Sequence, residues 1–524
     1  MSEKTFPFYI NISDDKVRAC NFAFWGILAY ALLSWLSIQI NLAITADTLW
    51  LCEAAERLLS GIKMSEGYFD PNPPLSVLLY IPPALIAKAG IMPIYTAAFF
   101  YTLIFLGLFG WLTWKLLQSI PGIDHTAAVM ITSGYVVTHT ILVSLSYTER
   151  DQIIGMALLP FVLSQLRLTY KWQTDRKFLH LSWFFGAILI LIKPHHGLIP
   201  TILLLHRAII QRRLTVWKDP DFLYLAGSVL AYGAILQIFF KDYLTIILPD
   251  VLDLYLGGSY QQILTQSFLH ALLCITGILV SLVVAEKNGI SRLFFLAALL
   301  SLIPYITQMH GYHYHLIPAA TFFWCGLSLL LLNIMRVIMH PALALILTSL
   351  VTIIFAYALT PTRLYFPNHY VYQRLPIGEY ISQCEDPCPF FILNDHIEIT
   401  HQTSVYLDKP WASRFPSFWF LPQIFLMEES HPEKFLEYRK KYAELFAEDL
   451  DRYKPKLVLI GEFAMIRDEI ADFVSFFEKE DSFNKAWASY KRIDDFKTDQ
   501  QPYFAGTKID KPRPITYRVY QRSD

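Results

Sequence analysis

The sequence has few charged residues and almost no net charge. Only 17% of its 524 residues are Asp, Glu, Lys or Arg, whereas a soluble chain usually has about 25%. The formal net charge of −1 leaves no basic surface of the kind that nucleic-acid binding needs. Apolar residues take the place of the missing charge, at 54% of the chain. The long apolar runs lie within residues 1–360, and residues 361–524 have the composition of a soluble domain.

Cysteine is also scarce, and known phosphate and zinc motifs are missing. The six cysteines do not form the two close pairs of a zinc site, and no glycine-rich phosphate-binding loop is visible. Only Cys384 and Cys388 are close in sequence. They either form a local disulfide or remain two thiols in a turn, and the sequence leaves both open.

Eleven apolar segments approach the roughly 20 residues that a membrane-spanning helix needs. We expect a polar cytoplasmic tail at residues 1–20 and an uncleaved first helix after it. One broken helix around Lys193-Pro194 is an alternative that would reduce the count to ten. The predicted spans are 21–43, 94–117, 126–146, 153–170, 180–193, 195–210, 222–240, 263–285, 291–308, 313–332 and 341–360.

Lysine and arginine give these spans an orientation, because positive residues collect on the cytoplasmic side. With a cytoplasmic N-terminus, fourteen Lys and Arg residues fall inside and six outside. An odd span count then places residues 361–524 outside the cytoplasm. Counting 180–210 as one helix would move Arg212, Arg213, Lys287 and Arg292 outside, so eleven spans fit better. The protein is therefore expected in a bacterial inner membrane.

Two regions outside the spans have their own patterns. Residues 44–93 form a long first outside loop, in which 74–90 is apolar but interrupted by Pro82 and Pro83, as in an interfacial or re-entrant helix. Residues 361–524 alternate strand-like runs (389–396 and 455–463) with charged helical runs (428–450 and 464–480). This alternation predicts a small α/β domain.

Asp47 directly follows the first span, and its carboxylate could take a proton from an acceptor hydroxyl. On position alone, the simpler interpretation is that Asp47 is the N-cap of the next helix. Apolar residues alternate with Glu53, Glu56 and Arg57 beyond it, which predicts an amphipathic helix lying on the membrane.

Two more outside segments combine polar and aromatic side chains. Tyr68 and Asp70 precede a proline-rich helix start. Prolines that only mark the beginning of a helix would also explain this pattern. Glu149, Arg150 and Asp151 occupy a tight turn between two spans. That cluster either marks the water boundary, forms a self-contained ion pair, or orients a sugar or phosphate.

Histidines occur at two predicted outside junctions. Lys193 can bind a phosphate as a point charge, and His195 and His196 follow it. Adjacent residues point to different faces, so we favour phosphate contact over a metal there. The second junction alternates histidine and tyrosine, and we expect a wet cavity mouth that receives substrate. Its residues are His310, His313, Tyr314 and His315.

The order of these motifs resembles the GT-C superfamily of integral-membrane glycosyltransferases. Within it, the chain looks most like the branch of the lipid A aminoarabinose transferases and protein O-mannosyltransferases. The resemblance covers residues 21–360 and extends weakly to 411–416. The matching elements are Asp47 after the first helix, Pro73-Pro74-Leu75, Glu149-Arg150-Asp151, the 191–197 junction and Tyr314-His315-Leu316-Ile317-Pro318. The family's usual Asp-Glu pair is a single Asp here, and a His pair replaces Gly and Pro at the junction.

This resemblance implies a mechanism. A polyprenyl-phosphate monosaccharide would be the donor, no nucleotide sugar or cofactor would be needed, and a divalent metal is not favoured. Asp47 would be the general base on a lipid, glycan or protein hydroxyl, with Glu149 and Asp151 as further catalytic acids. The donor phosphate would be held by Lys193, Arg150, His195 and His196. Substrate would contact Tyr68, Asp70, His313, Tyr314 and His315.

Two functions of other classes compete with this interpretation. A transporter or flippase for lipid-linked saccharides would also have many helices, but it would more often show two repeated halves and charges inside its spans. No such repeat is visible. A non-catalytic envelope-assembly protein is the second alternative, in which Asp47 would only cap a helix.

Overall fold

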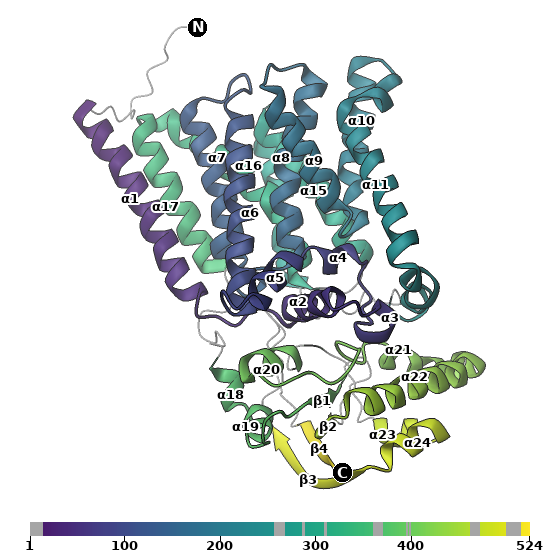
Figure 1. The fold of residues 1–524 in the computed structure, drawn as a ribbon. Coiled ribbons are helices and arrows are strands. Elements are labelled where there is room, and N and C mark those ends of the chain that lie inside the picture. Colours follow the sequence, from purple (N-terminus) through teal and green to yellow (C-terminus); the bar gives the residue numbers. More distant parts are fainter. Residues whose placement is uncertain are drawn as a thin grey trace. The chain divides into compact units, whose positions relative to one another are not determined.

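The computed structural model describes residues 14–255, 268–285, 289–308, 312–359, 370–394, 397, 400–461, 472–498 and 515–523 (Figure 1). These residues form two compact units. Unit 1 consists of the described residues of 1–41, 99–234 and 259–364, and unit 2 of those of 42–98, 235–258 and 365–524. The first predicted outside loop therefore packs with the C-terminal residues.

Unit 1 is a helical bundle, and every one of the eleven predicted spans contains a helix. Several of the helices run side by side in Figure 1. The main helices are α1 Asp14–Gln39, α6 Ile94–Leu117, α7 His125–Val137, α8 Arg150–Tyr170, α9 Arg176–Ile190, α10 Leu198–Gln211, α11 Pro220–Phe239, α14 Phe268–Val284, α15 Ile290–Gln308, α16 Ile317–Ile338 and α17 Pro341–Leu359.

Six helices in the described part of the chain are long and apolar enough to cross a membrane. They are α1, α6, α8, α11, α15 and the helix of His313–Ile338, so the chain is a multi-pass membrane protein. The other predicted spans contain shorter helices, and the count of eleven stays a prediction. The 180–210 region holds two helices, α9 and α10, joined by residues 191–197.

Helix α8 lies at the centre of unit 1. From Arg150 to Leu166 its residues are buried, and an all-round buried helix needs apolar residues on every face. By contrast, Leu230 and Phe239 of α11 are more than 70% exposed, as expected for a helix that faces lipid.

Unit 2 contains a four-stranded sheet in the order β1-β2-β4-β3. Strands β1 (Phe390–Leu393) and β2 (Leu457–Gly461) are parallel, and β4 (Ile515–Arg522) is antiparallel to β2 and to β3 (Tyr490–Thr498). The two predicted strand-like runs coincide with β1 and β2. Two further strands, β3 and β4, escaped notice; β3 is mostly charged and exposed.

Helices complete unit 2. The charged run of 428–450 forms α22 (Pro432–Tyr453), as predicted, while part of the 464–480 run lies outside the described residues. The others are α2 Ala46–Leu59, α3 Met64–Gly67, α4 Leu75–Leu78, α5 Ile81–Lys88, η5 Tyr243–Ile247, α12 Leu248–Asp250, η6 Val251–Tyr255, α18 Val371–Arg374, α19 Pro376–Ser382, α20 Thr400–Leu407, α21 Leu421–Ser430, α23 Phe473–Phe477 and α24 Asp481–Trp487.

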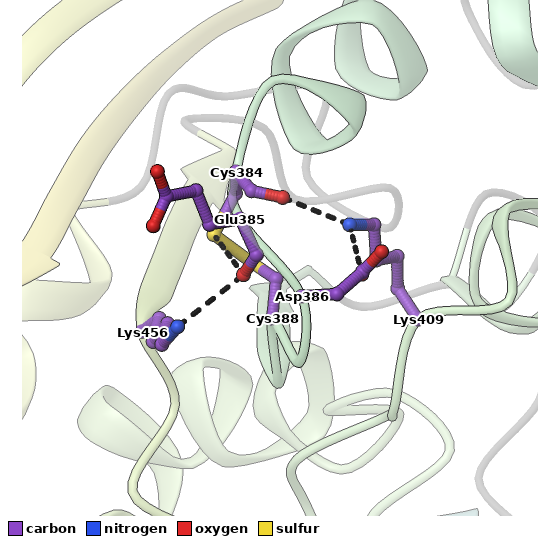
Figure 2. The surroundings of a disulfide bond; sticks show 6 residues. All are labelled: Cys384, Glu385, Asp386, Cys388, Lys409 and Lys456. Atoms are coloured by element: carbon purple, nitrogen blue, oxygen red, sulfur yellow. Dashed lines mark hydrogen bonds and ion pairs between the residues drawn. A yellow bond between two sulfur atoms is a disulfide. The ribbon is translucent and has the colours of Figure 1, made fainter.

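Cys384 and Cys388 form a disulfide in the turn before β1 (Figure 2). Lys409 Nζ donates to Cys384 O at 2.8 Å and to Asp386 Oδ1 at 2.5 Å. Lys456 Nζ donates to Glu385 O at 3.3 Å. The structure therefore selects the disulfide from the two interpretations that the sequence left open, and two lysines hold the turn around it.

Three segments that are distant in sequence are bonded to one another inside unit 2. Ser65 N donates to Asp242 Oδ2 at 2.8 Å, and Lys441 Nζ to Asp250 Oδ1 at 2.6 Å. Bonded groups lie on one side of a membrane, so the chain must cross it an even number of times between Ser65 and Asp242. Six predicted spans satisfy this requirement, whereas merging 180–210 into one would leave five.

Candidate functional site

A buried ion pair lies at the N-terminal end of α8. Lys193 Nζ, in the junction between α9 and α10, is 2.6 Å from Asp151 Oδ2. The Asp151 side chain is fully buried and that of Lys193 is 9% exposed. Two predicted site residues from separate segments therefore meet, and each supplies the counter-charge that the other needs when desolvated.

His196 and His195 extend this pair. His196 is fully buried, with Nε2 3.6 Å from Asp151 Oδ1, and its ring lies 4.7 Å from that of His195. Among the described residues, His196 Nδ1 and His195 Nε2 have no hydrogen-bond partner. A buried polar atom without a partner costs about 1–3 kcal/mol, so a ligand that supplies partners would be bound favourably.

Glu149 and Arg150 lie close to the Lys193–Asp151 ion pair. Both are buried, and both act electrostatically on Lys193. The turn before them is unusual, because Thr148 has φ +85°, a value rare for a β-branched residue. Its N–H donates to Gln152 Oε1 at 2.8 Å. Strained backbone of this kind persists where the surroundings enforce it, often at functional sites.

The histidine–tyrosine segment reaches the pair from η7 (His313–Leu316). Lys193 Nζ lies 5.5 Å from the centre of the Tyr314 ring, and the Tyr314 ring is 4.5 Å from that of His315. His313 Nε2 is 3.0 Å from Ser146 Oγ, beside the Thr148 turn. His310 lies outside the described residues. Unit 1 thus brings nine predicted residues into one polar cluster, which we call the Lys193 cluster: Glu149, Arg150, Asp151, Lys193, His195, His196, His313, Tyr314 and His315.

Asp47 lies in unit 2, in the first turn of α2, and is half-buried. It is not the N-cap, because that position is occupied by Thr45, whose side chain accepts from Thr48 N at 3.4 Å. The interpretation of Asp47 as a helix cap is therefore wrong. A helix start that contains several Ser, Thr, Asp or Asn residues has more than one potential N-cap. The sequence spacing therefore did not show whether Thr45 or Asp47 occupies that position.

The apolar face of α2 also differs from expectation. Leu49, Ala54 and Ala55 are fully buried inside unit 2, so that face packs against protein and does not lie on the membrane. An apolar stripe has the same sequence signature whether lipid or protein covers it.

Tyr68 and Asp70 are buried close to α2. Trp50 Nε1 donates to Asp70 Oδ2 at 2.5 Å, and Asn72 N donates to Asp70 Oδ1 at 2.6 Å. Burial, reinforced by Asp242, raises the pKa of Tyr68. Only 2% of Asp70 and 1% of Tyr68 are exposed, so both are built into the wall of unit 2.

Two charged residues of α2, Glu53 and Arg57, form a polar group with a histidine that the sequence did not identify. Arg57 Nη2 is 2.6 Å from Glu53 Oε1, and His401 Nδ1 is 3.2 Å from Glu53 Oε2. Burial alone raises the pKa of Glu53, but Arg57 and His401 outweigh it and hold this pKa below its ordinary value. The i,i+4 spacing of Glu53 and Arg57 was visible, whereas nothing in the sequence marked His401.

The 411–416 segment has a structural role. Arg414 is 2% exposed; its Nε is 2.7 Å from Asp449 Oδ1 and its Nη1 donates to Ser65 O at 3.2 Å. Arg414 O accepts from Phe69 N at 2.7 Å. The segment therefore joins α22 to the loop that contains Tyr68 and Asp70. Among the described residues, no group of three or more His, Cys, Asp or Glu is arranged to hold a metal ion.

Comparisons with known proteins found structural likeness only. No family model and no curated protein matches the sequence. The archaeal oligosaccharyltransferase AglB from Archaeoglobus fulgidus, solved with an inhibitory peptide and a dolichol-phosphate, is similar over 84% of this chain and 69% of its own, with 11% identity and a TM-score of 0.43. ArnT from Cupriavidus metallidurans, solved bound to undecaprenyl phosphate, is similar over 94% of this chain and 98% of its own, with 11% identity and a TM-score of 0.40.

Proposed function

We propose that this membrane protein is a glycosyltransferase that moves a monosaccharide from a polyprenyl-phosphate donor to a hydroxyl acceptor. The observation that carries the proposal is the Lys193 cluster, where a buried lysine, an arginine and two histidines with unpartnered ring nitrogens lie together with Glu149 and Asp151. The motif order that resembles the GT-C superfamily supports the same function.

The cluster suits the phosphate of the donor. An ammonium group has three donors, and Asp151 takes one of those of Lys193. Lys193 and Arg150 would stabilise the charge that develops on the leaving phosphate, and fixed cations in a dry site are effective there. His195 and His196 would donate to its remaining oxygens, which would satisfy their buried nitrogens.

The reaction itself is a displacement at the anomeric carbon. The acceptor oxygen forms a bond to that carbon as the bond to the phosphate oxygen breaks, which inverts the configuration and releases polyprenyl phosphate. Asp47 would take the hydroxyl proton as general base. We place the reaction at the outer face of a bacterial inner membrane, with a lipid, glycan or protein as acceptor.

Binding of the leaving group tests the phosphate site. Wild-type protein in detergent should bind polyprenyl phosphate, and Lys193→Gln should weaken that binding at least tenfold. Lys177→Gln is the matched control, because Lys177 is an exposed lysine of the same unit and its loss should change nothing. Equal binding by wild type and Lys193→Gln would remove the cluster as the phosphate site.

We also propose that transfer needs no divalent metal ion. Cations from side chains would do the work that a metal does in other phosphate sites. Activity should therefore persist after exhaustive chelation. If activity is lost and magnesium or manganese restores it, Glu149, Asp151, His313 and His315 become candidate ligands.

A further inference from the structure

The described part of the C-terminal domain holds one face of the helix that carries Asp47. An α-helix turns by about 100° per residue, so Trp50, Glu53 and Arg57 lie within about 60° of arc on α2. Asp47 lies about 60° round the helix from Trp50. The three side chains therefore define one face of α2, and Asp47 lies on its flank.

Each residue of that face is bound by residues from elsewhere in unit 2. Arg57 Nη1 donates to Ser413 O at 2.6 Å, and Arg57 Nη2 donates to Trp411 O at 2.9 Å. Its guanidinium lies over the Trp50 ring at 5.6 Å. These bonds fix the position of α2 along its axis and its rotation about that axis, because they hold one face of the helix through the planar Arg57 guanidinium.

His401, on α20, contacts the same face of α2. The centre of its ring is 4.8 Å from that of Trp50 and 4.9 Å from that of Trp411, and the residue is fully buried. Its Nδ1 is 3.2 Å from Glu53 Oε2, and its Nε2 is 3.2 Å from Pro416 O. Both neighbouring atoms are oxygens, so the ring is in contact at both of its nitrogens.

We infer that Glu53, Arg57 and His401 are positioning residues that set the direction of Asp47. This inference rests on the proposed function and gives the C-terminal domain a role in it. Glu53 contacts His401, and Arg57 is bonded to Glu53.

Replacing these residues should change kcat but hardly change KM. His401→Gln and Glu53→Gln should each lower kcat for sugar transfer about 10- to 100-fold, since small displacements of a reacting group cost that much. The KM for the donor lipid should change less than twofold, because the donor phosphate is assigned to the Lys193 cluster. The double variant should be no slower than either single one, because both remove the same interaction.

The comparison of kcat with KM distinguishes positioning from general support of the fold. In Glu53→Gln and His401→Gln, kcat per folded molecule should fall, while the KM for the donor lipid should stay within twofold of the wild-type value. His431→Gln is the control, since His431 is an exposed histidine of the same unit.

The outcomes separate the inference from the function on which it rests. An active wild type whose kcat survives in both variants overturns the positioning role and leaves the glycosyltransferase intact. Loss of kcat that matches a loss of folded protein also overturns it. A wild type that transfers no sugar overturns the proposed function, and the positioning role with it.

Discussion

Asp47 is the residue on which the chemistry depends, and the structure makes its test sharper. Because Thr45 caps α2, Asp47→Asn should leave stability nearly unchanged, while kcat should fall by about 10² to 10⁴ if the general base is lost. Thr45→Ala is the matched control and should cost about 1 kcal/mol of stability with much less effect on kcat. Transfer rate and thermal stability are measured on the same preparations.

Near-normal transfer by Asp47→Asn would remove Asp47 as the base. Of the other predicted acids, Asp70 is bonded to Trp50 and to Asn72 N, and Asp151 is paired with Lys193. The search for the base would then move to Asp70, Glu149 and Asp151.

The Lys193–Asp151 pair should matter for folding as well as for binding. Lys193→Met leaves Asp151 charged and buried, which typically costs about 3–5 kcal/mol. Adding Asp151→Asn to Lys193→Met should recover most of that stability, without restoring polyprenyl-phosphate binding. Chemical denaturation in detergent measures the first effect. A double variant as unstable as Lys193→Met would contradict the pairing.

The resemblance to the GT-C superfamily assigned Lys193, Arg150 and the two adjacent histidines to one phosphate, and in the structure these side chains lie in one cluster. Lys193, the two adjacent histidines and the 149–151 turn all belong to the Lys193 cluster. The partners of α2 were not predictable in this way. His401 and Glu53 are 348 residues apart, and no local pattern marks a contact that only the tertiary fold creates.

At the scale of elements, the stability that α2 contributes to unit 2 should depend on pH through Glu53. Its pKa is held below the ordinary 4.5, so its pairing stabilises unit 2 above that pH and is lost as pH falls through the lowered value. The melting temperature of wild type should therefore drop on acidification below about pH 4.5, and Glu53→Gln should flatten that drop.

Glu56 provides the control on the same helix. Burial, and then Glu53, raise the pKa of Glu56, so its charge does not contribute to stability in the same direction. Glu56→Gln should retain the acid-induced drop. If Glu53→Gln retains it too, the Glu53 pairing does not stabilise α2.

Span-forming elements were easier to predict than the elements of unit 2. Long apolar runs give a strong signal, and each predicted span contains a helix. In 74–90, Pro82 and Pro83 occupy the start of α5, so the expected interruption separates α4 from α5. Strand β3 was missed because a charged edge strand lacks the apolar alternation that marks a half-buried strand.

For the whole molecule, the three segments of unit 2 must share one side of the membrane. The disulfide of Cys384 and Cys388 favours the oxidising side, because such bonds are rare in the cytosol. Alkaline phosphatase fused after Asp524 should therefore be active in a bacterial host. An inactive fusion, together with an active cytoplasmic reporter at the same place, would contradict the predicted orientation.

The central claim is sugar transfer from a lipid phosphate, and the most direct test is turnover by the purified protein. Wild type is incubated with a panel of polyprenyl-phosphate monosaccharides and candidate hydroxyl acceptors, and the released polyprenyl phosphate and glycosylated product are quantified together. We predict equal amounts of the two products with at least one donor, and an inverted anomeric centre. Movement of the intact donor across a vesicle membrane, with no polyprenyl phosphate released, would contradict the account and identify a transporter.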